Sequence, residues 1–340
     1  MALSTNKYLR FLSLFLIALF TFCSAGTFPK KQQHEQNKED QKNIFLADPT
    51  IFYHKGTYYL YGTGGAAYNN GFAVYTSADL KTWTGPVGAK EGYALKMGDA
   101  YGDSKFWAPQ VFEYNNKFYM AYAANEHIAI AVSDNPFGPF RQKISKSLSE
   151  ETKQIDPYVF NDDDGKKYLY YVVVANGGNR IFVAEMNDDM LSVKKETAKQ
   201  CIEATGVWEN TANDKWSVTE GPTVIKRNNL YYLIYSANDF RSIDYAVGYA
   251  VSKSPYGPWQ KYEGNPIIHK SITGQNGSGH GDLVKGSNND WWYVFHTHNS
   301  ADKVAPRKTA IIKMNFIKDK KTGIEKLSAQ PGSFSYLYQK

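Results

Sequence analysis

Three acidic residues stand out because each lies beside a proline at the start of an aromatic, β-branched segment. Asp48 and Asp156 directly precede a proline, whereas one glycine separates Glu220 from its proline. A single acid at a strand start is usually a solvated or turn-capping residue, but three in equivalent positions indicate a shared function. Because proline restricts the residue before it, we expect an extended backbone at Asp48 and Asp156 that helps to aim their side chains.

Such acids can work as an acid and a base if the fold brings them together. Carboxylates that converge on one cavity repel one another, which pushes their pKa values apart. One group then keeps its proton at a pH at which another is ionised. Hydrolysis of a glycosidic bond requires such a pair, because one group protonates the leaving oxygen and the other activates water.

The acids belong to a unit that occurs five times along the chain. Each unit is a pair of aromatic and β-branched strands joined by a turn of Asn, Asp or Gly residues, which is typical of a β-hairpin. The first strands of the five units are residues 47–53, 107–112, 155–160, 220–225 and 279–284. Their equivalent positions 49, 109, 157, 222 and 282 are 60, 48, 65 and 60 residues apart. This period fits propeller blades of three or four strands with long loops.

The repeat predicts an all-β protein, a five-bladed β-propeller. Beyond the N-terminal segment, no run longer than about ten residues has clean helical periodicity. A β-sandwich is the alternative, but it does not explain why the units share a start motif. In a propeller the innermost strands surround one axis and their starts converge on one mouth of the central channel. We therefore expect Asp48, Asp156 and Glu220 to meet there.

Five short motifs resemble glycoside hydrolase family 43 and occur in the order of that family. They are Ala-Asp-Pro at 47–49, Phe-Trp-Ala-Pro at 106–109, Ile-Asp-Pro at 155–157, Glu-Gly-Pro at 220–222 and Gly-His-Gly at 279–281. The resemblance runs from residue 44 to about residue 318 and implies an inverting propeller hydrolase that acts on arabinan, arabinoxylan or xylan. It implies that Asp48 is the general base, Glu220 the general acid, and Asp156 the residue that tunes the pKa of the acid and orients it.

Three further residues match the family less closely. His280 resembles a channel histidine that helps to hold a hydrated calcium ion on the axis, with a hydrogen-bonded core histidine as the alternative. Arg307 lies where the family often has an arginine that contacts the sugar or the base. Trp107 resembles an aromatic residue of the sugar subsite, with a core role as the alternative. The resemblance implies no required cofactor; the calcium would be structural.

Two other patterns suggest a metal ion but fail a closer test. Residues 161–165 read Asn-Asp-Asp-Asp-Gly, yet an EF-hand would need acids where the chain has Phe160 and Tyr171. We interpret this segment as a hairpin turn. His296 and His298 lie on one face of a predicted strand, but no third ligand is evident, so we expect structural roles.

The N-terminus has the features of an export signal. Lys7 and Arg10 precede a mostly apolar run, residues 11–22, that is too short for the roughly 20 residues of a membrane span. We assign residues 1–25 to a signal peptide, with a lipoprotein signal that ends before Cys23 as the alternative. The predicted location is periplasmic, secreted or lipid-anchored to the outer membrane.

The remaining chain divides into a tether and a catalytic domain. Residues 26–43 are mostly polar and cannot bury enough apolar area to fold, so we expect a flexible tether. Residues 44–340 form the predicted propeller. Cys201 is the only cysteine besides Cys23, so we expect a buried thiol and no internal disulfide.

Composition limits the classes of partner. The formal net charge of +6 is weak and scattered, which argues against nucleic acid. Aromatic residues make up 15% of the chain, and flat rings pack well on the apolar faces of sugars. The expected partner is a plant polysaccharide or oligosaccharide, bound by a monomer without a transmembrane span.

The leading functional hypothesis is an exo-acting α-L-arabinofuranosidase. β-D-Xylosidase and endo-arabinanase activities of the same family are the alternatives, because the sequence does not reveal whether the loops form a pocket or a groove. Outside the enzyme class, the alternative is a propeller that binds carbohydrate without cutting it. The three acids favour the enzyme, because a binding protein has no need of all of them.

Overall fold

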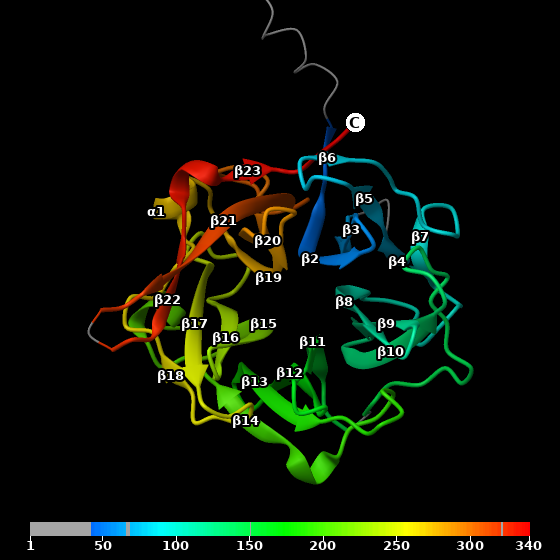
Figure 1. Ribbon diagram of the computed structural model, residues 1–340, viewed down its shortest axis with the longest axis horizontal. Coiled ribbons are helices and arrows are strands. Elements are labelled where there is room, and N and C mark those ends of the chain that lie inside the picture. Colours follow the sequence, from blue (N-terminus) through cyan, green and yellow to red (C-terminus); the bar gives the residue numbers. More distant parts are fainter. Residues whose placement is uncertain (1–41, 66–68, 150, 321) are drawn as a thin grey trace, which may run out of the picture. The chain divides into compact units, whose positions relative to one another are not determined.

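Blades of mostly antiparallel strands surround a central axis in the computed structural model, which describes residues 42–65, 69–149, 151–320 and 322–340 (Figure 1). This arrangement is a five-bladed β-propeller, as the sequence predicted. One compact unit spans Gln41–Lys340. Residues 1–25 and most of the tether lie outside the described residues, so the predictions of a signal peptide and of lipidation at Cys23 stay predictions.

The blades follow one another along the chain, and each begins at the axis. Blade one contains β2 (Leu46–His54), β3 (Thr57–Gly64) and β5 (Tyr75–Ser77), with the pair β4 (Gly71–Ala73) and β7 (Tyr93–Lys96) outside it. Blade two contains β8 (Trp107–Tyr114), β9 (Lys117–Ala124) and β10 (His127–Ser133). Blade three contains β11 (Gln154–Asn161), β12 (Lys167–Ala175), β13 (Gly178–Glu185) and β14 (Lys199–Ile202).

The last two blades have four main strands each. Blade four contains β15 (Ser217–Arg227), β16 (Leu230–Ala237), β17 (Ala246–Ser252) and β18 (Gln260–Lys261). Blade five contains β19 (Gly279–Lys285), β20 (Trp291–Thr297), β21 (Lys308–Lys318) and β22 (Glu325–Ala329), with β23 (Ser335–Tyr336) also paired to β21. The helical segments are short: α1 (Lys270–Thr273) and the 3-10 turns η2 (Lys195–Thr197), η3 (Val207–Glu209) and η4 (Pro331–Ser333). None of these described helices reaches the length and hydropathy of a membrane span.

Aromatic and branched side chains fill the space between neighbouring blades. Side chains alternate across a strand, so each blade can contribute to the two interfaces on its sides. In β12, Tyr170 packs in the cluster between blades three and four, whereas Leu169 and Tyr171 pack in the cluster between blades two and three. Both faces of the inner strands are thus buried, which explains why their sequences are nearly continuous apolar runs.

Every blade has the same irregularity near the start of its innermost strand. The register shifts by one extra residue on the inner strand, which is the pattern of a β-bulge. One residue of each bulge is left-handed: φ is 47° at Asp48, 44° at Ala108, 53° at Asp156, 59° at Gly221 and 44° at His280. The predicted extended backbone at Asp48 and Asp156 is therefore wrong. Proline favours an extended backbone at the residue before it. Here the hydrogen-bonded pairing with the second strand, which resumes after the bulge, outweighs that preference.

The two ends of the described chain close the ring together. Strand β1 (Lys42–Asn43) pairs with β24 (Tyr338–Gln339), which pairs in parallel with β6 (Thr82–Trp83) of blade one. The backbone N–H of Ile44 donates to Leu337 O at 3.0 Å, and both side chains are buried in the cluster between blades five and one. Strand β1 consists of Lys42 and Asn43, the last two residues of the segment that the sequence analysis assigned to the tether.

Candidate active site

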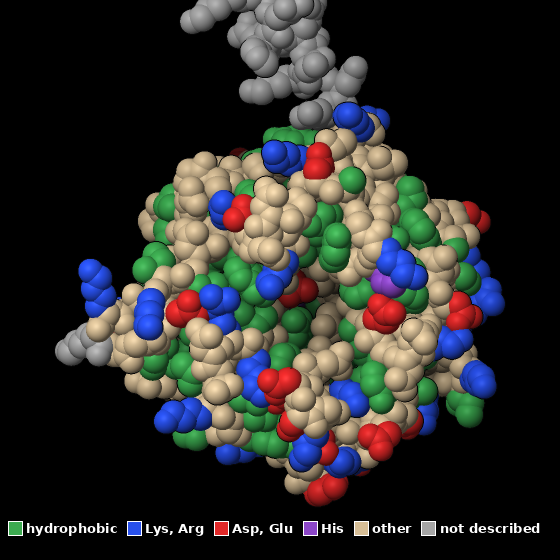
Figure 2. Space-filling model, viewed as in Figure 1, with side chains coloured by type: hydrophobic (Ala, Val, Ile, Leu, Met, Phe, Trp, Pro, Cys, Tyr) green, Lys and Arg blue, Asp and Glu red, His purple; other side chains and the backbone are tan. Residues whose placement is uncertain are grey.

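The bulges bring all six residues singled out in the sequence to one cavity at the mouth of the channel. The cavity has a volume of about 360 Å³, within the usual size range of small-molecule sites. Its lining includes Asp48, Trp107, Asp156, Glu220, His280 and Arg307. Figure 2 shows the hollow at the centre of this face, with acidic and basic side chains around it.

The acids occupy two different positions of the bulge rather than one. Asp48, Asp156 and His280 are left-handed residues, and blade four has Gly221 at that position. Glu220 lies one residue earlier, in the position that Trp107 occupies in blade two. The acids therefore approach the cavity from two positions of the bulge, in agreement with the one-residue offset between Glu220 and its proline.

Asp48 is surrounded by hydrogen-bond donors and positive charge. Its Oδ2 accepts a hydrogen bond from Thr63 Oγ1 at 2.6 Å, and its Oδ1 accepts one from Arg307 Nη1 at 3.0 Å. The Nδ1 atoms of His280 and His296 each lie 3.4 Å from the same Oδ1. Burial would raise the pKa of Asp48, but the charge of Arg307, together with the hydrogen bond from Thr63, outweighs it and holds the pKa well below its ordinary value. Asp48 is therefore ionised at neutral pH.

His296 is a site residue that sequence reasoning missed. It is fully buried, and its Nδ1 accepts a hydrogen bond from the backbone N–H of Asp48 at 3.1 Å. Burial holds the pKa of His296 well below its ordinary value, so the ring is neutral. His298, its neighbour two residues on, lies 2.9 Å through Nε2 from the carbonyl of Phe240 instead. The two histidines therefore have different partners, and only His296 contacts the backbone of a site carboxylate.

Glu220 is held by neutral groups in the part of the chain that the structure describes. Its Oε1 accepts a hydrogen bond from Tyr245 OH at 2.8 Å, and its Oε2 accepts one from Asn179 Nδ2 at 3.2 Å. Burial raises the pKa of Glu220 to about 7, and the charges of Asp48 and Asp239 act in the same direction. The Tyr245 and Asn179 hydrogen bonds act the other way but do not cancel the rise. Glu220 therefore keeps its proton in weakly acidic solution.

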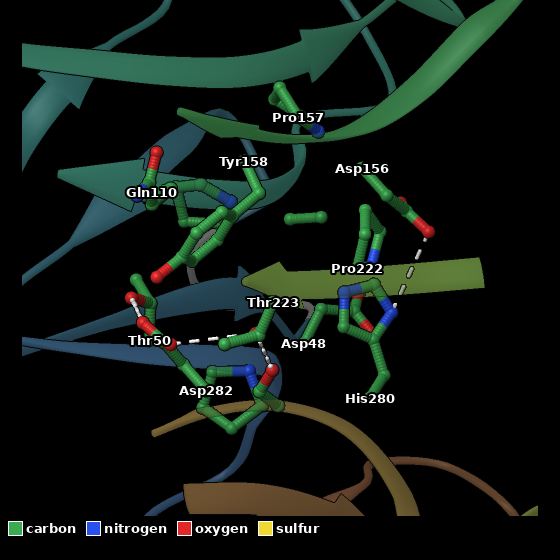
Figure 3. A pocket seen from close by; sticks show the side chains of 14 residues that line it. Asp48, Thr50, Gln110, Asp156, Pro157, Tyr158, Pro222, Thr223, His280 and Asp282 are labelled. Carbon is green, nitrogen blue, oxygen red and sulfur yellow. Dashed lines mark hydrogen bonds and ion pairs between the residues drawn. The ribbon is translucent and has the colours of Figure 1, made fainter. Parts of the chain in front are cut away.

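Asp156 lies near the other two acids, and its pKa is also raised. Its Oδ2 accepts a hydrogen bond from the backbone N–H of Gly221 at 3.1 Å and lies 3.7 Å from His280 Nδ1 (Figure 3). Burial, followed by the charges of Glu220 and Asp48, holds the pKa of Asp156 well above its ordinary value. The crowding expected from the sequence is present, but burial is the first cause of the raised values.

Arg307 and Trp107 lie on the wall of the cavity. The guanidinium of Arg307 is 4.6 Å from the ring centroid of Phe240, which holds the side chain against Asp48. Trp107 is partly exposed, and Lys105 Nζ lies 5.8 Å from its ring centroid. Trp107 lines the cavity, whereas the alternative role would place its ring in the core.

Comparison with known proteins agrees with this geometry. The family model described as glycosyl hydrolases family 43 matches residues 42–322. The chain belongs to this family. It is therefore a glycoside hydrolase of a family whose members act on polysaccharides.

Similar family 43 proteins carry several activities in their names. A crystal structure of an endo-1,4-β-xylanase from Bacteroides thetaiotaomicron VPI-5482 is 40% identical, covers 88% of this chain and 99% of that one, and superposes with a TM-score of 0.80. A thermostable family-43 glycoside hydrolase is 38% identical, with 84% and 92% covered and a TM-score of 0.73. The β-D-galactofuranosidase xynD of Aspergillus niger is 26% identical over 80% of each chain.

The channel beneath the family 43 site is narrow and polar. Figure 3 shows its lining, in which Asp282 Oδ2 accepts a hydrogen bond from Thr50 Oγ1 at 2.6 Å. Thr223 Oγ1 lies 3.5 Å from Asp282 Oδ1. Burial raises the pKa of Asp282 to about 6. The space enclosed here is about 20 Å³, room for about one water molecule.

These residues do not fit a hydrated calcium ion in their present positions. Calcium takes six to eight oxygen ligands, and an ion held through water at His280 would need space for several water molecules. The described residues also contain no group of three or more His, Cys, Asp or Glu side chains around a common metal position. Calcium near His280 therefore stays a prediction, and no chemical step depends on it.

Proposed function

We propose that this protein is an inverting, exo-acting glycosidase that removes α-L-arabinofuranosyl units from plant arabinoxylan or arabinan. One observation carries the proposal: a single cavity holds one carboxylate kept ionised and one carboxyl kept protonated. Arg307 stabilises the charge on Asp48, whereas burial keeps the proton on Glu220. Hydrolysis needs this combination at one pH.

In the proposed reaction, water attacks the anomeric carbon as the glycosidic bond breaks. Asp48 accepts a proton from the attacking water, and the new bond joins the water oxygen to the anomeric carbon. Glu220 gives its proton to the leaving oxygen, which departs with the bonding electron pair as an alcohol. Both oxygens of Glu220 already accept hydrogen bonds from Tyr245 and Asn179, so its own proton is free for the substrate. The two acids exchange protons with solvent before the next cycle.

The remaining predicted residues receive supporting roles. We assign Arg307 to the stabilisation of ionised Asp48 and Trp107 to the wall of the sugar subsite. Asp156 positions the blade-four bulge through Gly221, next to the acid. His280 lies between Asp48 and Asp156 and orients both carboxyl groups.

Exo action is the first candidate, with endo action as the alternative. Below the site the channel offers room for about one water molecule, so the substrate enters from the mouth of the cavity. The second candidate substrate is a β-D-xyloside, favoured by the endo-1,4-β-xylanase name of the 40% identical structure.

Hydrolysis of matched substrates tests the proposal. The purified protein should release 4-nitrophenol from the α-L-arabinofuranoside faster than from the β-D-xyloside or the β-D-galactofuranoside. Arabinoxylan should yield free arabinose, and linear arabino-oligosaccharides should shorten by one unit at a time. Faster xyloside cleavage would replace the first candidate by the second. No release from any glycoside would contradict the enzyme proposal.

Stereochemistry tests the mechanism separately. Single displacement by water gives a first product with the anomeric configuration opposite to that of the substrate. Proton NMR during the first minutes should therefore show the β-anomer of arabinose before mutarotation mixes the two forms. Initial appearance of the α-anomer, or a covalent sugar trapped on Asp48, would show a retaining enzyme.

A further inference from the structure

Trp216 is a large apolar side chain that stays in contact with solvent at the rim of the catalytic cavity. It is 47% exposed and directly precedes strand β15, four residues before Glu220. Phe240, at 36% exposure, lines the same cavity. Exposed rings on a cavity that binds sugar offer flat apolar faces for a sugar ring.

The indole of Trp216 is also linked to Glu220 through one residue. Trp216 Nε1–H donates to Asn179 Oδ1 at 3.1 Å, and Asn179 Nδ2–H donates to Glu220 Oε2 at 3.2 Å. An Asn side chain has its acceptor and its donors on opposite sides. The indole N–H therefore selects the orientation of Asn179 in which the amide faces Glu220.

The backbone of this region fixes the three residues relative to one another. Strands β13 and β15 pair in parallel across two blades, with Asn179 opposite Val218. Asn179 is buried, with 9% exposure, so its amide has little freedom to rotate away. The linkage from the rim to the acid thus lies along a paired sheet edge rather than on a free loop.

The chemistry of the reaction places the leaving group on this side of the cavity. An acid that protonates the leaving oxygen must lie next to the part of the substrate that departs. Asp48 lies among Arg307, His280 and His296, whereas Asn179 and Tyr245 hold Glu220. The leaving sugar therefore emerges past Glu220 towards the rim that carries Trp216.

We propose that Trp216 binds the first sugar of the leaving group on its ring face and, through Asn179, orients the acid that protonates it. This inference rests on the proposed function of Glu220. Trp216 is then a specificity-determining residue for oligosaccharides, and Asn179 is a positioning residue. A leaving group too small to reach the ring, such as fluoride, gains no binding free energy from it.

Two substrates separate these roles. Trp216→Ala should lower kcat/KM for an arabinoxylan oligosaccharide about tenfold more than kcat/KM for arabinofuranosyl fluoride, whose leaving group is too small to contact the ring, since one lost aromatic contact costs about a factor of ten. Trp216→Phe keeps a ring and should retain most of the oligosaccharide preference. Tyr53→Ala is the matched control, because Tyr53 is 51% exposed outside the cavity and should change neither substrate. Equal losses on both substrates would overturn the binding role.

The pH profile tests the link to the acid. The Asn179 hydrogen bond lowers the pKa of Glu220, so losing it should move the alkaline limb to higher pH. Both Trp216→Phe and Asn179→Ala should show this shift, and the double variant should shift no further than Asn179→Ala. An unchanged limb in both single variants would overturn the orienting role.

Failure of this inference is distinguishable from failure of the proposed function. If the wild-type protein hydrolyses glycosides and Glu220→Gln does not, the proposed function stands whatever Trp216 does. If Trp216→Ala then loses both substrates equally, only the leaving-group inference falls. If the wild-type protein hydrolyses neither substrate, the proposed function itself falls.

Discussion

Asp48 and Glu220 are equally buried, yet their surroundings give them different protonation states. Their exposed fractions are 8% and 9%, and both lie at the start of an innermost strand. Asp48 is in contact with a guanidinium and two imidazoles, whereas a phenol and an amide hold Glu220. Burial favours the protonated form of both groups. Only at Asp48 does a neighbouring positive charge, that of Arg307, overcome this effect.

The partners also come from different parts of the ring. The residues that stabilise ionised Asp48 are supplied mostly by blade five, from β19, β20 and the segment that leads into β21. The residues that hold Glu220 belong to blades three and four. The base and the acid therefore differ in protonation because they lie on two sides of the channel mouth with different neighbouring residues.

The most damaging change removes either carboxyl group. Asp48→Asn and Glu220→Gln should each lower kcat on an unactivated oligosaccharide by about 10² to 10⁴-fold, the usual contribution of an acid or base. The amides keep the shape but cannot take up or give the proton. Circular dichroism should show that both variants stay folded. Retention of more than about a tenth of the activity would mean that the residue has another role.

Removing the positive charge beside Asp48 should make it more like Glu220. Arg307→Met should raise the pKa of Asp48 and move the acidic limb of the rate profile up by about one pH unit or more. Arg241→Met removes the same charge from the rim, where Arg241 pairs with Asp239, and should leave the acidic limb in place. A shared shift in both variants would point to a general charge effect.

The wild-type alkaline limb reports the proton on Glu220. Activity should fall as the pH rises above about 7, because the group must be protonated and its pKa is about 7. Tyr245→Phe removes a donor that lowers this pKa, so the limb should move to higher pH. The ring stacks on His296 in either case, with centroids 5.6 Å apart. A limb that moves to lower pH would contradict the assignment.

The smallest expected effect is on stability. The pKa of Glu220 rises from 4.5 to about 7 on folding, so the stability that its neutral form provides is complete below pH 4.5 and lost as the pH rises through 7. Glu220→Gln escapes this loss. Its Tm should exceed that of the wild type at pH 8 and match it at pH 4. A lower Tm at pH 8 would show that the charged group is stabilised in the native state.

The fold was predictable because the sequence repeats one unit five times. Five hairpins with a common start motif require five blades, and the aromatic strands pack between them. The bulge was not predictable in the same way, because the preference before proline is local whereas the left-handed residue at Asp48 is set by pairing with Thr63 and Tyr61 on the next strand.

The partners of the acids carry no comparable signal. His296 lies 248 residues from Asp48 in sequence, and Asn179 lies 41 residues before Glu220. Neither belongs to the repeated motif. Only the ring, and the parallel pairing of β13 with β15, brings them into contact. Sequence reasoning could therefore find the groups that react and, through the family resemblance, Arg307 and His280 beside the base, but not His296 or Asn179.

Ring closure has a consequence for the order of synthesis. Asp48 is made early, whereas its guanidinium partner Arg307 comes 259 residues later. The strand that holds the ring shut, β24, is later still. A ribosome that stops before Tyr338 leaves a chain without this closing strand. Asp48 should therefore contact its guanidinium partner only after the last blade has docked, so unfinished chains should be inactive.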